Sequence, residues 1–197
     1  MTTSFSNGYL EIILGCMFSG KTSHLIEIYK KCNFCNIKVC IINHSADTRY
    51  DSTMISTHDK VMVPCIQTVD ISNLWFSEEN PQYKELHEAD VILINEAQFF
   101  PNLYNCVISM VQEKKRVHIG GLDGDFNRNK FGELLELIPY CDKVIKLTAL
   151  CGICKNGTVA IFSRRITEEK EQTVIGSDIY VPVCRECFQS PAVPTIA

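Results

Sequence analysis

Apolar residues in the first three quarters of the chain fall into short, near-continuous runs separated by polar segments. A strand covered by helices on both faces is apolar throughout, whereas a strand with one wet face alternates. The runs therefore predict an α/β fold with a mostly parallel sheet flanked by helices. They occupy residues 9–14, 38–42, 91–94, 117–119 and 144–147.

The segments between these runs are expected to carry the helices. We place them at residues 21–35, in part of 82–89 and at 101–114. Pro101 would stand just inside the start of the last helix, where a missing N–H loses no hydrogen bond.

The pattern changes after about residue 148. Cysteine and glycine become frequent, and the strand-like runs shorten to 158–163 and 172–175, with a charged turn at 168–171 between them. We expect an α/β domain at residues 1–148, a small appended domain at 149–190 and a loose, proline-containing tail at 191–197.

Composition narrows the classes of protein and partner. The 197 residues have a formal charge of -4 and a pI near 5.7, so nucleic acid is not the expected partner. No apolar run reaches the roughly 18 residues of a membrane helix, and the first residues do not resemble a signal peptide. We therefore expect a soluble, cytoplasmic protein without a membrane partner. The 11 cysteines, an odd number, favour thiols or a metal site over a disulfide framework.

Residues 15–22 read Gly-Cys-Met-Phe-Ser-Gly-Lys-Thr and match the phosphate-binding loop GxxxxGK[ST]. An apolar run precedes this P-loop and a helical segment follows it. In such a loop the backbone N–H groups cradle phosphates, Lys21 reaches the β- and γ-phosphates, and Thr22 binds Mg²⁺. We expect a bound nucleoside triphosphate; the alternative is a glycine turn without a ligand. The expected contacts are Gly15, Met17, Phe18, Ser19, Gly20, Lys21 and Thr22.

Glu96 follows the apolar run 91–94 directly. Ligands of open α/β sheets lie outside the carboxyl ends of the strands, so Glu96 is expected to face the P-loop. A carboxylate there can accept the proton of an attacking hydroxyl group. The alternative is a solvated glutamate at the start of a loop.

The P-loop, residues 95–100 and residues 121–126 together resemble the type II thymidine kinase family, the cytosolic and viral type. Further similar blocks occur in the family's order over most of the chain, at 47–50, 57–59, 131–132, 144–149, 151–154, 174–176, Tyr180 and 183–187. The resemblance implies transfer of the γ-phosphate of ATP to the 5′-hydroxyl of thymidine or deoxyuridine, giving dTMP. It also implies a homotetramer, with dTTP as a candidate feedback inhibitor.

The resemblance assigns catalytic roles to Glu96 as general base, to Lys21 and to Arg49. Asp47 and Arg49 match a family segment near the phosphates, although a surface Asp-Arg pair fits the sequence equally well. The family has Asp before the base, whereas this chain has Asn95, which supplies no negative charge. We expect activity with altered Mg²⁺ dependence. Asn95 and Gln98 are also expected to contribute to the binding site of ATP, the phosphate donor.

In the family, a loop between two cysteine pairs closes over the nucleoside as a lasso, which corresponds to residues 155–183. This chain has two more residues than the family between Cys154 and Ser163, and one fewer between Gly176 and Tyr180. A broader deoxynucleoside kinase is therefore an alternative. The expected nucleoside contacts are Met17, Phe99, Leu122, Phe126, Phe131, Ser163, Thr173, Val174, Ile175, Gly176 and Tyr180; without the resemblance, the apolar ones among them would read as core residues.

Two CxxC pairs, Cys151/Cys154 and Cys184/Cys187, offer the four thiolates of a closed structural zinc site. The alternative is four free thiols. A third pair, Cys32 and Cys35, lies far from them in the sequence and is interpreted as packing or coincidence rather than metal or redox chemistry.

Two functions from other classes remain open. A P-loop ATPase or switch would use Glu96 to polarise water. A zinc-ribbon binding module without catalysis is suggested only by Asn95.

Overall fold

The computed structural model describes residues 6–46, 54–56, 61–174, 176 and 179–190. Its centre is a six-stranded sheet in the order β5-β2-β6-β7-β1-β8, in which every adjacent pair is parallel. Each of the five apolar runs forms one of these strands, which confirms the expected α/β class. The strands are β1 (Tyr9–Gly15), β2 (Val39–His44), β5 (Ile66–Thr68), β6 (Val91–Asn95), β7 (Arg116–Gly121) and β8 (Lys143–Leu147).

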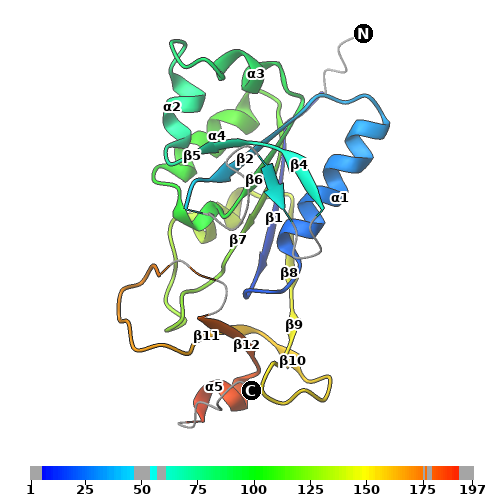
Figure 1. Cartoon of the computed structure of the whole chain (residues 1–197). Helices are drawn as coiled ribbons and strands as arrows, with labels where there is room; N and C mark the ends of the chain where they lie inside the picture. Colours follow the sequence, from blue (N-terminus) through cyan, green and yellow to red (C-terminus); the bar gives the residue numbers. More distant parts are fainter. Residues whose placement is uncertain (1–5, 47–53, 57–60, 175, 177–178, 191–197) are drawn as a thin grey trace.

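Helices cover both faces of the sheet (Figure 1). Alternate residues of β1 point to opposite faces, so Ile12 packs in one core cluster and Ile13 in the other. The Ile13 side is covered by α1 (Lys21–Phe34) and the hairpin β3 (Met54–Ser56)–β4 (Met62–Pro64). The Ile12 side is covered by α2 (Ile71–Phe76), α3 (Tyr83–Glu88), α4 (Leu103–Gln112) and the 3₁₀ helix η2 (Leu134–Tyr140).

Helix α4 starts later than the sequence predicted. Pro101 lies before the helix rather than in its first turn, because Asn102 adopts a left-handed conformation with φ 55°. The side chain of Asn102 does not cap the helix. Instead, the carboxylate of Glu133 accepts a hydrogen bond from Tyr104 N at 2.9 Å. A cap from a residue so distant in sequence leaves no local signal.

The C-terminal unit consists of two short hairpins and one helix. The pairs are β9 (Ala149–Leu150) with β10 (Val159–Ala160) and β11 (Phe162–Arg165) with β12 (Tyr180–Val183), followed by α5 (Arg185–Gln189). The expected strand 158–163 is therefore divided between two hairpins. The expected strand 172–175 is wrong for its described part, since residues 172–174 form no strand.

The register of the sheet brings the candidate residues to one edge. Leu14 pairs with Gly121 across β1 and β7, and Asn43 pairs with Asn95 across β2 and β6. The segments that follow these strands include the P-loop and the short 3₁₀ helix η1 (Ala97–Phe99). They all leave the sheet at its carboxyl edge, where ligands of parallel sheets bind. No helix among the described residues has the length and apolarity needed to cross a membrane.

Candidate functional site

The P-loop has the conformation of an anion-binding turn. Gly20 adopts φ 87°, a left-handed conformation that favours glycine, and α1 begins at the next residue. The Lys21 ammonium is buried and donates to the carbonyl oxygen of Cys16 at 2.8 Å. Ser19 Oγ is buried without a hydrogen-bond partner among the described residues. A buried cation and an unsatisfied hydroxyl beside a helix N-terminus fit a phosphate group.

Glu96 stands immediately after β6 in a left-handed conformation, with φ 52°. Such a conformation is unfavourable for a residue with a side chain and persists where the surroundings impose it. Gln98 Nε2 donates to Glu96 Oε2 at 2.7 Å, while Gln98 Oε1 accepts from Leu122 N at 3.0 Å. Gln98 is only 3% exposed, so it holds the carboxylate in place against the end of β7. This bridging contact was not anticipated from the sequence.

A chain of amide side chains lies beneath the P-loop. Thr22 Oγ1 donates to Asn95 Oδ1 at 3.3 Å, and Asn95 Nδ2 donates to Asn43 Oδ1 at 2.8 Å. Asn43 Nδ2 donates in turn to Gln67 Oε1 at 3.3 Å. Asn95 is 1% exposed, and its carboxamide oxygen faces Thr22. Two neutral oxygens therefore stand where the sequence predicted a magnesium ligand, and oxygen is the ligand type that Mg²⁺ prefers.

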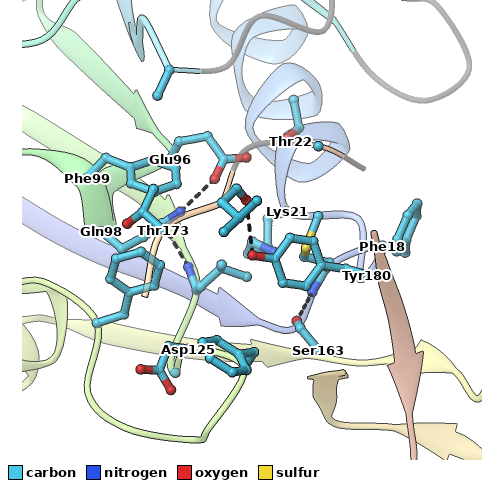
Figure 2. Close-up of a pocket in the computed structure, with 18 of the residues that line it drawn as sticks. Phe18, Lys21, Thr22, Glu96, Gln98, Phe99, Asp125, Ser163, Thr173 and Tyr180 are labelled. Atoms are coloured by element: carbon cyan, nitrogen blue, oxygen red, sulfur yellow. Dashed lines mark hydrogen bonds between the residues drawn. The ribbon is translucent and has the colours of Figure 1, made fainter. Parts of the chain in front are cut away.

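A single cavity joins the P-loop, Glu96 and the C-terminal unit, and encloses about 1060 Å³ including its open mouth. In Figure 2 the carboxylate of Glu96, the side chain of Lys21 and the ring of Tyr180 surround the same space. Most of the predicted site residues line it: Met17, Phe18, Gly20, Lys21, Thr22, Glu96, Gln98, Phe99, Leu122, Phe126, Phe131, Ser163, Thr173, Val174, Gly176 and Tyr180.

Other predicted residues are placed elsewhere. Gly15, Ser19 and Asn95 are not among the residues that line the cavity. Gly15 instead packs against the end of β8, where a Cβ atom would come within 2.5 Å of the carbonyl oxygen of Leu147. Asp47, Arg49 and Ile175 lie outside the described residues.

Asp125 and Gln172 also line the cavity and were not predicted as site residues from the sequence. Asp125 Oδ1 accepts from the backbone N–H groups of Asn127 and Asn129, a turn motif that aspartate commonly forms. Its Oδ2 accepts from Gln172 Nε2 at 2.9 Å, which ties residues 121–131 to the loop after β11. The turn has a sequence signal, but the contact across 47 positions has none.

Aromatic rings form one wall of the cavity. Phe99 and Phe131 meet edge to face, with ring centroids 5.3 Å apart. The imidazole of His44 lies 5.3 Å from the Phe99 ring. Burial lowers the pKa of His44, although the charge of Glu96 acts in the opposite direction. A neutral ring behind the wall keeps this side of the cavity apolar.

Hydrogen bonds connect the P-loop with the C-terminal unit. Met17 N donates to Ser163 Oγ at 2.9 Å, and the Cys16 thiol donates to the carbonyl oxygen of Ala160 at 3.5 Å. Ser163 belongs to β11 and Ala160 to β10. Both hairpins therefore touch the start of the P-loop.

The sulfur atoms of Cys151, Cys154, Cys184 and Cys187 lie within 4.8 Å of one another. A tetrahedral zinc ion with Zn–S bonds of about 2.3 Å would separate its ligand sulfurs by about 3.8 Å. Burial raises the pKa of Cys151, but hydrogen bonds from backbone N–H groups, chiefly those of Cys154 and Cys184, outweigh it and lower the pKa to about 6. The cluster is compatible with a structural zinc ion.

The third cysteine pair is separate from this cluster. Cys32 is half-buried against the core on the α1 side, and Cys35 is exposed. Among the described residues, only the four C-terminal cysteines form a group that could hold a metal ion. The packing interpretation of Cys32 agrees with its position.

Comparison with known proteins identifies the family. The family model of thymidine kinase matches residues 8–188. The chain belongs to the thymidine kinase family. Among its relatives, the thymidine kinase of Yaba monkey tumor virus is 39% identical over 92% of this chain and 95% of its own. Thymidine kinase 1 of Dictyostelium discoideum is 38% identical over 93% of this chain and 78% of its own, and the sheeppox virus thymidine kinase 36% over 92% and 97%.

Family membership confirms the resemblance. The segment between Cys154 and Ser163, expected from the sequence to be two residues longer than in the family, includes an exposed turn. Residues 155–157 are part of the connection between β9 and β10, and Gly157 adopts φ 88° there. Asn156 Oδ1 accepts from the backbone N–H and the hydroxyl of Thr158. The turn is exposed apart from half-buried flanks and does not line the cavity. This turn therefore follows Cys154 of the cysteine cluster directly and lies outside the cavity beside Glu96.

Proposed function

We propose that this protein is a thymidine kinase that transfers the γ-phosphate of ATP to the 5′-hydroxyl of thymidine, giving dTMP. Deoxyuridine, which lacks only the 5-methyl group, is expected to be a second substrate. The observation that carries the proposal is the shared cavity: the P-loop, Glu96 and the loop after β11 all open into it. A member of the thymidine kinase family with this arrangement can hold donor and acceptor side by side.

The donor side consists of the P-loop and its helix. Backbone N–H groups and the N-terminus of α1 bind phosphate oxygens, and Lys21 exchanges its contact with the Cys16 carbonyl for the β- and γ-phosphates. Asp47 and Arg49 remain predicted contributors on this side. Thr22 and Asn95 would hold Mg²⁺, directly or through water, and the ion would neutralise charge on the phosphates.

The acceptor side consists of the aromatic wall and the loop after β11. A flat base fits between Phe99, Phe131 and the backbone of residues 173–174, with Ser163 and Tyr180 at the border with the P-loop. Backbone groups recognise the base by its hydrogen-bond pattern, while the side chains limit its size. This division accounts for a preference for thymine over larger purine bases.

Glu96 acts as the general base. Its carboxylate accepts the proton of the 5′-hydroxyl as the oxygen bonds to the γ-phosphorus, and the bond to the β-phosphate oxygen breaks to release ADP. Gln98 holds Oε2 through a 2.7 Å hydrogen bond, so the carboxylate is oriented before substrate arrives. Cys151, Cys154, Cys184 and Cys187 would hold a structural zinc ion, which would tie together the hairpins that carry the acceptor side.

An assay of purified protein with labelled ATP and a panel of deoxynucleosides tests the proposal. Transfer to thymidine and deoxyuridine, with little transfer to purine nucleosides, is the expected result. Vigorous ATP hydrolysis unaffected by thymidine would instead identify a P-loop ATPase. Equal transfer to all deoxynucleosides would identify a broad-specificity kinase. Light scattering and addition of dTTP to the same preparation test the proposed homotetramer and feedback inhibition.

A further inference from the structure

Arg165 is a buried cation at the end of β11. Arg165 is 7% exposed, and its hydrogen-bond partners among the described residues are all neutral oxygens. Nη1 donates to the carbonyl oxygens of Glu169 and Glu171 at 2.8 and 2.6 Å. Nη2 donates to the carbonyl oxygen of Gln172 at 3.1 Å, and both Nη2 and Nε donate to the Tyr180 hydroxyl, at 2.7 and 3.2 Å. These five bonds match the five N–H donors of a guanidinium group.

The residues that Arg165 holds belong to the cavity wall. Tyr180 lines the cavity, and its hydroxyl donates to the carbonyl oxygen of Val174 at 3.0 Å. The guanidinium carbon of Arg165 lies 3.7 Å from the ring centroid of Phe126, another lining residue. Because the Tyr180 hydroxyl accepts from the guanidinium on one side, its own proton is directed to Val174. Arg165 therefore contacts three residues of the wall, Phe126, Gln172 and Tyr180, without lining the cavity itself.

We propose that Arg165 is the positioning residue of the acceptor side, and that its guanidinium fixes residues 169–174, Tyr180 and Phe126 in the arrangement that binds the nucleoside. The loop after β11 has no ladder of backbone hydrogen bonds in residues 170–174 to hold it. Its carbonyl groups converge on the guanidinium instead. Arg165 pairs with Tyr180 across the β11–β12 hairpin, whose other end pairs Phe162 with Val183 next to Cys184. The cysteine cluster thus anchors one end of the hairpin. At the other end, Arg165 fixes the residues that would contact the nucleoside.

Lysine cannot replace arginine at this position. An ammonium group has three donors around one nitrogen atom, whereas the carbonyl groups of Glu169, Glu171 and Gln172 and the Tyr180 hydroxyl surround a planar fork. An ammonium also lacks the flat face that stacks on Phe126. The proposal therefore predicts that Arg165→Lys behaves like Arg165→Met rather than like the wild type.

Steady-state kinetics of Arg165→Met and Arg165→Lys test the proposal, which rests on the proposed function for its substrate. Losing charge-assisted hydrogen bonds should raise KM for thymidine by about 10- to 100-fold in both variants. The value of kcat at saturating thymidine and KM for ATP should change by less than about threefold, because Glu96 and the P-loop are not touched. The matched control is Arg164→Met, since Arg164 donates from the same strand to the carbonyl oxygen of Cys187 and not to the loop. Unchanged thymidine KM in Arg165→Met, or an equal rise in Arg164→Met, would overturn the proposal.

Chemical rescue and proteolysis give readouts that loss of folding alone would not produce. Millimolar guanidinium should lower the raised thymidine KM of Arg165→Ala, whereas methylammonium at equal ionic strength should not. Exposed Lys170 lies between the two carbonyl groups held by Nη1, so trypsin should cut after it at least several-fold faster in Arg165→Met, with zinc content unchanged. Absence of both effects would contradict the role.

These readouts also separate this proposal from the proposed function. Wild-type protein that phosphorylates no nucleoside would refute the function, while the trypsin experiment would still report on Arg165. Wild-type protein that phosphorylates thymidine, together with Arg165→Met that is unaltered in KM and cleavage rate, would refute the role of Arg165 alone.

Discussion

The parallel sheet and the C-terminal unit position their site residues by different physical means. In the sheet, β-ladders and two apolar core clusters bring the P-loop and Glu96 to one edge. In the C-terminal unit the buried apolar cluster is small, comprising Cys151, Ala160, Val181, Val183 and Cys184, two of which are thiols of the cysteine cluster. Side-chain clamps therefore replace a core there: four thiols at one end and Arg165 at the other. We expect the two regions to be damaged separately, by different changes.

The largest effect is expected from a substitution that removes the general base at the sheet edge and leaves the C-terminal unit intact. Glu96→Gln should reduce kcat by about 10²- to 10⁴-fold, the usual contribution of a positioned general base. Thymidine binding and zinc content should stay close to wild type, because the side chain keeps its size and its contact with Gln98. Single-turnover kinetics measure the rate of phosphate transfer, calorimetric titration measures thymidine binding, and metal analysis measures zinc content. Exposed Glu113→Gln is the matched control; a retained rate in Glu96→Gln would remove this residue from the mechanism.

The second largest effect is expected from a substitution that destabilises the C-terminal unit more than the sheet. Cys184→Ala removes a thiol of the cluster, together with the sulfur that accepts a hydrogen bond from Cys187 N at the start of α5. Zinc should be released, and KM for thymidine should rise by about tenfold or more as the hairpins loosen. KM for ATP should rise less, through the contact of Ser163 with Met17 N. Metal analysis and kinetics measure these changes, with exposed Cys35→Ala as control. Unchanged zinc content in the purified variant would contradict the assignment of the cluster.

The same difference between the two regions explains which features of the fold and the site could be predicted from the sequence. Unbroken apolar runs and the GxxxxGK[ST] motif located the strands and the P-loop, because both are local patterns with a direct structural cause. The cavity residues followed from family resemblance, and most of them line the cavity. Arg165 was not identified, since its partners are backbone oxygens and a hydroxyl, which no residue pattern announces. The expected strand at 172–175 was wrong for residues 172–174 for the same reason: the carbonyl groups of Gln172 and Val174 bond to side chains.

A smaller effect is expected on the Mg²⁺ dependence of activity, and it tests the role of Asn95 at the sheet edge. Asn95→Asp should lower the Mg²⁺ concentration for half-maximal activity by about two- to tenfold, because a carboxylate adds negative charge beside Thr22. The change also replaces the donor that faces Asn43 Oδ1, so the Asn43 amide must turn and lose its bond to Gln67. A modest loss of thermal stability should therefore accompany the gain. Magnesium titrations of both proteins decide the matter, and identical curves would show that position 95 does not influence the metal.

The smallest expected effect is on the pH dependence of stability. It arises from buried ionisable groups, whose surroundings differ between the sheet and the C-terminal unit. In the sheet, His118 Nδ1 lies 2.9 Å from Glu11 Oε2, and Lys143 lies 2.9 Å from Glu11 Oε1. Burial lowers the pKa of His118 and outweighs the opposing effect of Glu11; Arg116 and His24 lower it further. The pKa of Glu11 is also lowered, because Lys143 and His118 outweigh its burial. In the C-terminal unit, by contrast, buried Arg165 donates its hydrogen bonds to neutral carbonyl and hydroxyl oxygens.

Acid should therefore weaken the sheet through His118 and then through Glu11. The unfolded chain protonates His118 near pH 6.5 while the folded protein resists, so stability falls as pH decreases below that value. The contribution of Glu11 is present above about pH 4.5 and is lost as pH falls through the lower pKa of the folded state. In His118→Gln the fall in Tm between pH 7 and about pH 5 should be shallower, by about 2–4 °C for each kcal/mol of linkage removed. Differential scanning calorimetry across this range measures the slope. Equal slopes in both proteins would show that His118 is not held neutral in the folded state, and that buried charge does not distinguish the two regions.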